Sequence, residues 1–219
     1  MSMRFDDVQA VLFDMDGTLI DSEQYTEGAV LRLLAEHGIV DVGVDLTSLY
    51  GITWDAAAER VKAAHPSLAS VDVSTALQGH FADLSEELGV ALVPGSDVFF
   101  TACAERFKVG LCTSNVRSEA ERCLGHFPVF EALGATVTSE DVPRSKPDPY
   151  GYLLVADKLG VHPTRCVVFE DSIAGLQAAR AAGMRCVAVT HRSPDLEKVT
   201  SLADAVIADY AHAVERFLS

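Results

Sequence analysis

Two aspartates, Asp14 and Asp16, directly follow an apolar run that has the composition of a buried strand. Residues two apart on an extended chain point to the same side, so the two carboxylates would lie close together. Like charges at such a distance raise each other's proton affinity, unless a cation lies between them. Carboxylate and carbonyl oxygens are the ligands that Mg²⁺ prefers. The pair therefore predicts a bound cation or a carboxyl group that carries a proton.

Two other structures could explain the same residues. Asp and Gly are common in turns, so Asp14, Asp16 and Gly17 could form a solvated turn. Together with Glu23 they also match the third, fifth, sixth and twelfth positions of an EF-hand calcium loop. In that loop, however, Leu12 would stand at the first ligand position, and a strand precedes the site where a helix is required.

Three later parts of the sequence carry candidate ligands for a phosphoryl group and a metal. These candidates are Thr113, Ser114 and Asn115; Lys146; and Glu170 and Asp171. Phosphoryl transfer needs donors for the phosphate oxygens, a cation and in-line geometry. Hydroxyl and amide groups after the second apolar run could hold phosphate oxygens, and Lys146 could act as a fixed positive charge. The two acids could bind the metal. Each group alone also fits an ordinary role, as a helix N-cap, a solvated loop lysine or acids at a helix N-terminus.

Short apolar runs are expected to form the strands that position these residues: 8–13, 108–112, 166–169, 185–189 and 205–207, with a further region at 135–139. Continuous apolar runs are typical of a parallel sheet covered on both faces. Helical patterns lie between them, over 152–159 and 173–182, and each ends at a glycine, Gly160 or Gly183. This alternation predicts an α/β fold with a doubly wound parallel sheet. Such sheets bind ligands at the carboxyl ends of their strands.

Residues 23–92 differ, because they contain no convincing strand. Apolar residues fall at helical spacing in three stripes: Val30, Leu33 and Leu34; Trp54, Ala57, Ala58 and Val61; Leu77, Phe81, Leu84 and Leu88. Thr53 is placed to cap the second helix, and Gly89 ends the third. We therefore expect an α/β core formed by 1–22 and 93–219, and a helical unit over 23–92 inserted after the first strand.

The composition limits the possible partners. The 219 residues carry a net charge of −15, which disfavours binding to nucleic acids. We find no apolar run long enough to span a membrane, and residues 1–7 do not resemble a signal peptide, so we expect a cytoplasmic protein. The five cysteines are widely spaced without a CxxC pair, which argues against a zinc site.

The order of these motifs resembles that of the haloacid dehalogenase-like (HAD) hydrolase superfamily over essentially the whole chain. The run DMDGTLIDS at 14–22 resembles its first motif and Thr113 its second. Lys146 within RSKPDP resembles the third motif, and the pair Glu170–Asp171 resembles the fourth. The resemblance implies a Rossmann-like core. The helical unit at 23–92 is similar to the small cap of the subgroup that contains β-phosphoglucomutase, phosphoglycolate phosphatase and sugar phosphatases.

The resemblance also implies a role for each residue. Asp14 would attack phosphorus and form an aspartyl-phosphate, while Asp16 would act first as a general acid and then as a general base. Thr113 and Lys146 would bind the phosphoryl oxygens, and the cap would close over the substrate. The implied ligands of Mg²⁺ are Asp14, the backbone carbonyl of Asp16, and Asp171, with Glu170 nearby.

Departures from the mutase pattern favour hydrolysis. The mutases usually carry a histidine where this chain has Thr26, and a cap arginine where it has Trp54, which cannot replace a phosphate ligand. A dehalogenase is disfavoured because Asp16 is present, and a phosphonatase because Lys62 shows no special setting. We expect a magnesium-dependent hydrolase of phosphoric monoesters that acts on a small sugar phosphate. A β-phosphoglucomutase-like mutase and a phosphoglycolate phosphatase are the alternatives.

A receiver domain of a signalling protein would also combine acids, a hydroxyl and a lysine on a doubly wound sheet. Receivers are shorter, however, and accept phosphate after the third strand, where this chain has Ser139-Glu140-Asp141. They also lack a helical unit after the first strand. We therefore favour the enzyme, with a small-molecule phosphate as its substrate, no nucleic acid or membrane partner, and a monomer or weak dimer as its assembly.

Overall fold

The computed structural model describes residues 5–50, 52–192 and 196–219. Two of the segments discussed above lie partly outside the described residues. They are residues 1–7, which were compared with a signal peptide, and the segment before Trp54, which includes Gly51 and was compared with the mutases. The chain forms two compact units. One consists of Met1–Asp21 and Leu92–Ser219, and the other of Ser22–Ala91.

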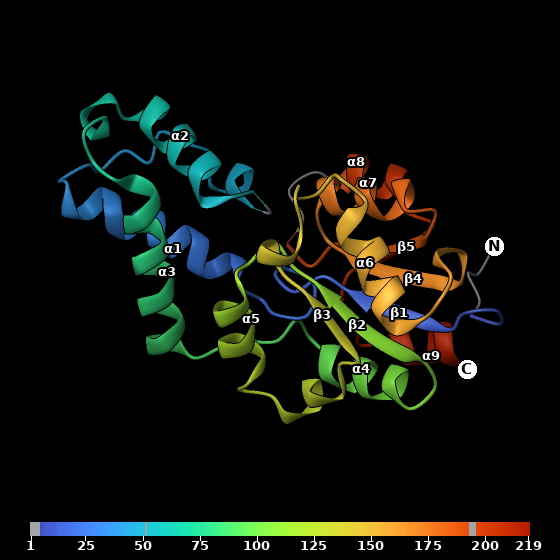
Figure 1. The fold of residues 1–219 in the computed structure, drawn as a ribbon. Helices are drawn as coiled ribbons and strands as arrows, with labels where there is room; N and C mark the ends of the chain where they lie inside the picture. The colour runs from blue at the N-terminus through green and yellow to red at the C-terminus, as the bar shows by residue number, and fades with distance from the viewer. Residues whose placement is uncertain (1–4, 51, 193–195) are drawn as a thin grey trace. The chain divides into compact units, whose positions relative to one another are not determined.

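The larger unit is built on a six-stranded sheet in the order β3-β2-β1-β4-β5-β6 (Figure 1). Its strands are β1 (Ala10–Phe13), β2 (Lys108–Cys112), β3 (Ala135–Val137), β4 (Cys166–Glu170), β5 (Arg185–Val189) and β6 (Ala205–Ile207). All five pairings between neighbours are parallel. The predicted doubly wound α/β fold is confirmed, and each predicted apolar run contains a strand. β1 begins at Ala10 rather than Val8, because the Val8 amide donates to the carbonyl of Phe5 in a turn.

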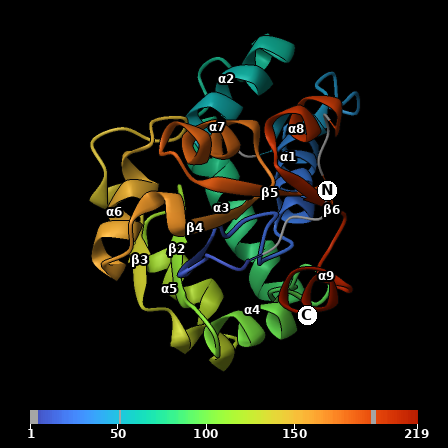
Figure 2. The same cartoon turned by 90° about the vertical axis from the view of Figure 1, so that its right-hand side faces the viewer.

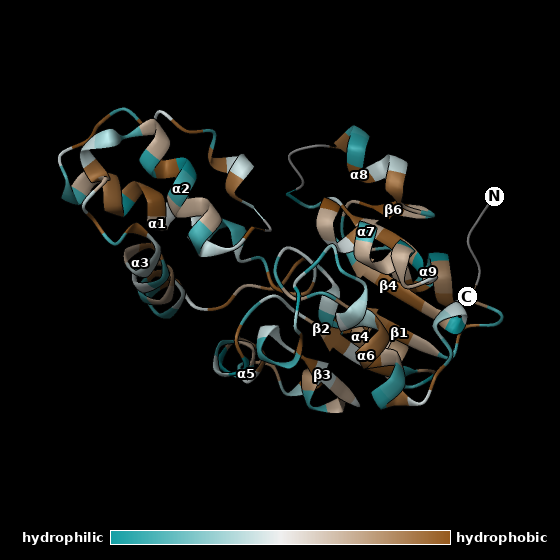
Figure 3. Ribbon diagram, turned by 45° about the horizontal axis from the view of Figure 1, so that its top comes forward, coloured by the Kyte–Doolittle hydropathy of each residue, from teal (hydrophilic) through white to brown (hydrophobic). Residues whose placement is uncertain are grey.

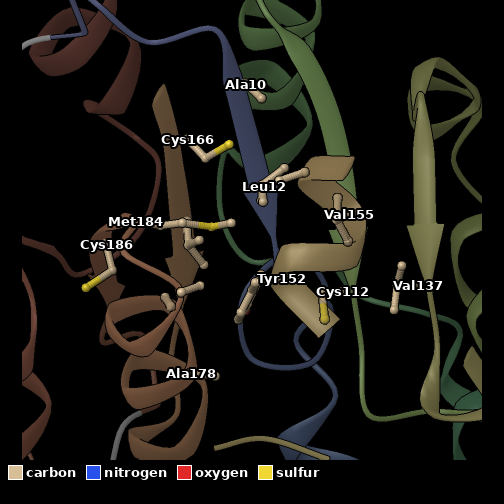
Figure 4. Close-up of a cluster of buried hydrophobic side chains, with 14 of the residues drawn as sticks. Ala10, Leu12, Cys112, Val137, Tyr152, Val155, Cys166, Ala178, Met184 and Cys186 are labelled. Atoms are coloured by element: carbon tan, nitrogen blue, oxygen red, sulfur yellow. The ribbon is translucent and has the colours of Figure 1, made fainter. Parts of the chain in front are cut away.

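The central strand β1 is buried along its whole length, and its side chains alternate between the two faces of the sheet. Ala10 and Leu12 join a cluster with side chains of β4, α6 (Tyr150–Leu159) and α7 (Ile173–Ala181), as Figure 4 shows. On the opposite face, the Phe13 ring stacks against Phe169 at 5.4 Å and contacts Phe100. Both faces are therefore apolar, which explains the continuous apolar run in the sequence.

Helices cover both faces of the sheet (Figure 2). α6 and α7 pack on one face, with α8 (Leu196–Leu202) beside α7, while α4 (Ser96–Ala104) contacts β2 and α9 (Ala213–Leu218). α5 (Arg117–Leu124) follows β2 in the chain. Short 3₁₀ helices occupy Pro128–Ala132, Ser139–Asp141 and Pro163–Arg165. On α6, Tyr152 is fully buried, whereas the neighbouring Leu153 is 38% exposed.

Among its described residues, the smaller unit consists of helices and connecting loops, without a strand. It contains α1 (Glu23–Glu36), α2 (Trp54–Ala64) and α3 (Val73–Leu88), with 3₁₀ helices at Leu46–Leu49 and Pro66–Leu68. The Thr53 side chain accepts a hydrogen bond from the Ala56 amide, which confirms the predicted N-cap. Trp54 is partly buried, and its ring packs edge-on against Phe81 at 5.2 Å, at the border of the apolar interior of this unit.

Hydrophobic residues concentrate on the buried strands of the sheet and on the inner faces of the helices, as Figure 3 shows. Among the described residues, no helix is both long and apolar enough to cross a membrane.

Candidate active site

The predicted site residues converge at one edge of the sheet, since the carboxyl ends of parallel strands all lie there. Asp14 follows β1, Thr113 follows β2, and Glu170 is the last residue of β4. The strand pairing extends to Asp14, whose amide donates to the Phe169 carbonyl at 3.0 Å. Three segments that are distant in sequence are therefore held side by side by backbone hydrogen bonds.

Lys146 joins two of these strand ends. Its Nζ lies 2.5 Å from Oδ1 of Asp14 and 2.7 Å from Oε1 of Glu170, and it also donates to the Cys112 carbonyl at 3.0 Å. Only 10% of its side chain is exposed. An ammonium has three N–H donors, and here each has an acceptor. Lys146 is thus a fixed positive charge, and the alternative of a solvated loop lysine is wrong.

Glu170 is fully buried and held on both of its oxygens. Oε1 accepts from Lys146 and from the Tyr152 hydroxyl at 3.1 Å. Oε2 accepts from the amide of Ser172 at 2.8 Å and from its hydroxyl at 2.9 Å. A carboxylate has about four acceptor positions, so protein donors already occupy those of Glu170.

Three acids form a group that could hold a metal ion. Asp14, Glu170 and Asp171 each offer one carboxylate oxygen, and these oxygens lie within 4.8 Å of one another. The Thr18 hydroxyl donates to Oδ1 of Asp171 at 3.3 Å. The Asp16 carboxylate is not part of this group, and its Oδ2 accepts a hydrogen bond from the side-chain amide of Asn115 at 2.6 Å.

The electrostatics of this group favour a cation. Burial raises the pKa of Asp14 to about 8, and the nearby carboxylates of Glu170 and Asp16 add to the rise, although Lys146 opposes it. Burial disfavours the charged form of Lys146, but Asp14 and Glu170 outweigh burial and raise its pKa well above the usual value. A single ammonium therefore does not balance the acids. Oxygen donors with excess negative charge fit a hard divalent cation such as Mg²⁺.

Gly17 allows Asp171 to approach the loop after β1. Its backbone is left-handed, with φ at +69°, and a Cβ built there would lie 2.3 Å from Oδ2 of Asp171. Any other residue would collide with the carboxylate and strain the backbone. The Asp-Gly sequence thus reflects a close approach to a candidate metal ligand rather than a solvated turn.

The candidate phosphate ligands have different settings. Thr113 is buried, and its hydroxyl accepts a hydrogen bond from the Asn115 amide at 3.1 Å. Thr113, Ser114 and Lys146 contribute to the lining of one cavity of about 90 Å³. Asn115 is instead bonded to Asp16, a partnership that sequence reasoning missed. The hydroxyls of Thr18 and Tyr152, which donate to Asp171 and Glu170, were also missed, since the sequence showed Tyr152 only as part of a helical pattern.

The sequence matches the haloacid dehalogenase-like hydrolase family over residues 8–183. The chain belongs to this family. Among its relatives, this HAD hydrolase is 35% identical to validoxylamine A 7′-phosphate phosphatase of Streptomyces hygroscopicus subsp. limoneus, over 92% of this chain and 93% of the relative. It is 33% identical to hexitol phosphatase B of Escherichia coli (strain K12), over 83% of each chain.

A solved structure has a similar fold. It is that of a conserved haloacid dehalogenase-like protein of unknown function from Agrobacterium tumefaciens, with a TM-score of 0.80 and 26% identity to this HAD hydrolase. The match covers 95% of this chain and 96% of the other.

Proposed function

We propose that this HAD hydrolase is a Mg²⁺-dependent phosphatase that cleaves a small sugar or polyol phosphate through an aspartyl-phosphate on Asp14. The observation that carries the proposal is the position of the Lys146 ammonium, 2.5 Å from Asp14 and 2.7 Å from Glu170 at the carboxyl edge of the sheet. A nucleophile beside a fixed positive charge is what transfer of an anionic phosphoryl group requires.

In the first half-reaction, a carboxylate oxygen of Asp14 forms a bond to phosphorus while the bond from phosphorus to the ester oxygen breaks. Lys146 stabilises the negative charge on the phosphoryl oxygens in the transition state. The Thr113 hydroxyl and the loop at Ser114 provide further donors, which is supported by their place in one cavity with Lys146.

Asp16 moves the protons. It donates a proton to the leaving alkoxide, and then accepts one from the water whose oxygen attacks phosphorus. The bond from Asp14 to phosphorus breaks, inorganic phosphate is released, and both aspartates return to their starting states. The 2.6 Å hydrogen bond from Asn115 supports this role, because it fixes the orientation of the Asp16 carboxyl group.

Asp14, Asp171 and the backbone carbonyl of Asp16 would hold the magnesium ion. Glu170 would lie beside it, because its own oxygens already accept from Lys146, Tyr152 and Ser172. When bound, the ion would supply positive charge that offsets repulsion between the phosphate and the carboxylates. The raised pKa of Asp14 supports the need for such a charge, since the nucleophile must be ionised at neutral pH.

The substrate class is proposed from the relatives. One of them is a validoxylamine A 7′-phosphate phosphatase and another a hexitol phosphatase, so phosphate esters of polyhydroxylated compounds are the first to test. In this proposal the helical unit at 22–91 acts as the cap that selects the leaving group. A cytoplasmic enzyme that works as a monomer or weak dimer belongs to the same proposal, and light scattering tests the assembly.

The direct test is a phosphate-release screen over hexose phosphates, hexitol phosphates and phosphoglycolate, with Mg²⁺ or with EDTA. We expect release from a sugar or hexitol phosphate with Mg²⁺ and none with EDTA. A coupled assay that converts β-glucose 1-phosphate to glucose 6-phosphate tests the mutase alternative. Conversion without net phosphate release would overturn the proposal, as would stable phosphorylation without turnover, which indicates a receiver.

A further inference from the structure

Tyr152, on the first turns of α6, carries a polar group in the apolar core (Figure 4). The residue is fully buried and belongs to the same apolar cluster as Leu12, Val155 and Leu176. Phenylalanine would pack there equally well, without the cost of burying a hydroxyl group. The hydroxyl therefore needs an explanation beyond packing, and the explanation lies in what it contacts.

The hydroxyl donates a 3.1 Å hydrogen bond to Oε1 of Glu170, the same oxygen that accepts from Lys146. The face of the Tyr152 ring also lies under Lys146, with Nζ 5.1 Å from the ring centroid. That distance is within the range of cation–π attraction. Tyr152 thus contacts both members of the Lys146–Glu170 ion pair, at two different parts of its side chain.

The location of the Lys146 ammonium depends on a competition between two carboxylates. It lies between Asp14 and Glu170, at 2.5 Å and 2.7 Å. A second donor on Oε1 takes up part of the negative charge of that oxygen and so weakens its pull on the ammonium. Without the hydroxyl, Glu170 would attract Lys146 more strongly and draw it from Asp14.

We propose that Tyr152 is a positioning residue, whose hydroxyl restrains Glu170 and whose ring supports the ammonium so that Lys146 stays directed at Asp14. The inference rests on the proposed phosphatase function for its catalytic consequence. Tyr152 acts through Lys146 and Glu170, and takes no part in bond making.

The test is Tyr152→Phe, which removes one oxygen and keeps the ring. A displaced Lys146 would stabilise the transition state less, so we expect kcat to fall about tenfold, in line with a hydrogen bond to a charged group. KM should change by less than about twofold, because the lost interaction matters mainly in the transition state. The folded fraction of each variant is measured by calorimetric unfolding, and kcat is then expressed per folded molecule.

Tyr210→Phe is the matched control. Tyr210 is also buried in the larger unit, stacked on Phe99 at 5.3 Å, but its hydroxyl has no hydrogen-bond partner among the described residues. The two variants lose the same atom from similar surroundings. We expect Tyr210→Phe to keep kcat within about twofold of the wild type, since no bond is lost. Equal kcat values for the two variants would overturn the inference.

A second measurement needs no substrate and so separates this inference from the proposed function. In protein labelled with ¹⁵N-lysine, exchange of the Lys146 ammonium hydrogens with water can be followed by NMR. We expect exchange at least about tenfold faster in Tyr152→Phe and unchanged in Tyr210→Phe, because an ammonium drawn toward Glu170 loses its hydrogen bond to Asp14. Unchanged exchange in Tyr152→Phe contradicts the inference, even if the wild type hydrolyses no ester.

A rescue variant identifies the hydroxyl as the cause. Replacing Tyr152 with 4-aminophenylalanine returns a donor to the same position on the ring. We expect kcat within about threefold of the wild type, since the hydrogen bond to Glu170 is restored. A variant that folds normally but stays as slow as Tyr152→Phe would show that packing, and not the donor, is what matters.

Discussion

The side-chain amide of Asn115 donates a 2.6 Å hydrogen bond to Oδ2 of Asp16, joining residues 99 positions apart in the sequence. Asn115 follows β2 and Asp16 follows β1, and these strands are neighbours in the sheet. The loop after one strand therefore sets the orientation of an acid on the loop after the next. Asp16 is the proposed proton carrier, so this hydrogen bond should influence the rate of the reaction.

Replacing Asn115 with alanine tests this relationship. The Asp16 carboxyl group loses a donor that helps to orient it but stays in place, so we expect kcat to fall about tenfold, less than the roughly 10²–10⁴-fold that general acid–base catalysis contributes as a whole. KM should change little, because Asp16 acts in the transition state. Steady-state kinetics would measure this loss of kcat. Ser118→Ala, at an exposed position on α5, is the control. Equal rates for the two variants would mean that the bond has no catalytic role.

Gly17→Ala should weaken metal binding. The new Cβ would meet the Asp171 carboxylate, and a left-handed alanine costs about 1–2 kcal/mol. Gly183→Ala is the control, because Gly183 also has a positive φ, of +74°, but open space around it. We expect both variants to lose stability. Only Gly17→Ala should bind Mg²⁺ more weakly, by at least about tenfold, which is the loss seen when residues that support metal ligands are replaced. Calorimetric titration with Mg²⁺ measures this, and equal affinities would contradict it.

Gly175→Ala should damage the core at Glu170. A Cβ on this α7 residue would lie 1.6 Å from Oε1 of Glu170, so the carboxylate must move and lose its buried hydrogen bonds. We expect a loss of stability of about 3–5 kcal/mol, typical of a disrupted buried ion pair. Gly79→Ala, in the exposed middle of α3 with nothing nearby, should instead raise stability by about 0.5–1 kcal/mol. Urea unfolding compares the two, and similar effects from both would rule out the collision.

The cysteines should be unreactive in the folded protein. All five are buried, and burial raises the pKa of Cys112 and Cys123 to about 12 and that of Cys166 and Cys186 to about 11. Burial shifts the pKa of Cys103 in the same direction. The thiolate is the reactive form, so at pH 8 labelling by a disulfide reagent should be at least about 100-fold slower than in urea, and should quicken as the pH rises. A thiol that reacts in native protein as fast as in urea would refute this.

The fold could be predicted because its strongest signals are local. The apolar runs marked all six strands, and glycines at positive φ marked the ends of α3 and α6. The helix α4 was not predicted, because Val98, Phe99 and Phe100 follow one another without a clear stripe. In the structure Phe99 and Phe100 are buried while Val98 is 62% exposed.

The site was predictable only as far as residue type and order reveal chemistry. Asp14, Lys146, Glu170 and Asp171 meet as expected. The supporting bonds were not foreseen, because Asn115 to Asp16 and Tyr152 to Glu170 each join different elements. Such partnerships depend on the packing of helix against sheet, which periodicity does not specify. The roles of the site residues, and the boundaries and closing of the cap, stay predictions.

Trapping of the reaction intermediate tests the central claim most directly. The protein is mixed with Mg²⁺ and a sugar phosphate that it hydrolyses, and the reaction is quenched in acid within one turnover. The quenched protein is then digested and examined by mass spectrometry. We predict a phosphoryl group on Asp14, and its accumulation in Asp16→Asn with an activated ester, because the attacking water then lacks its base. Turnover by the wild type without phosphorylated Asp14, or turnover that survives in Asp14→Asn, would contradict the account.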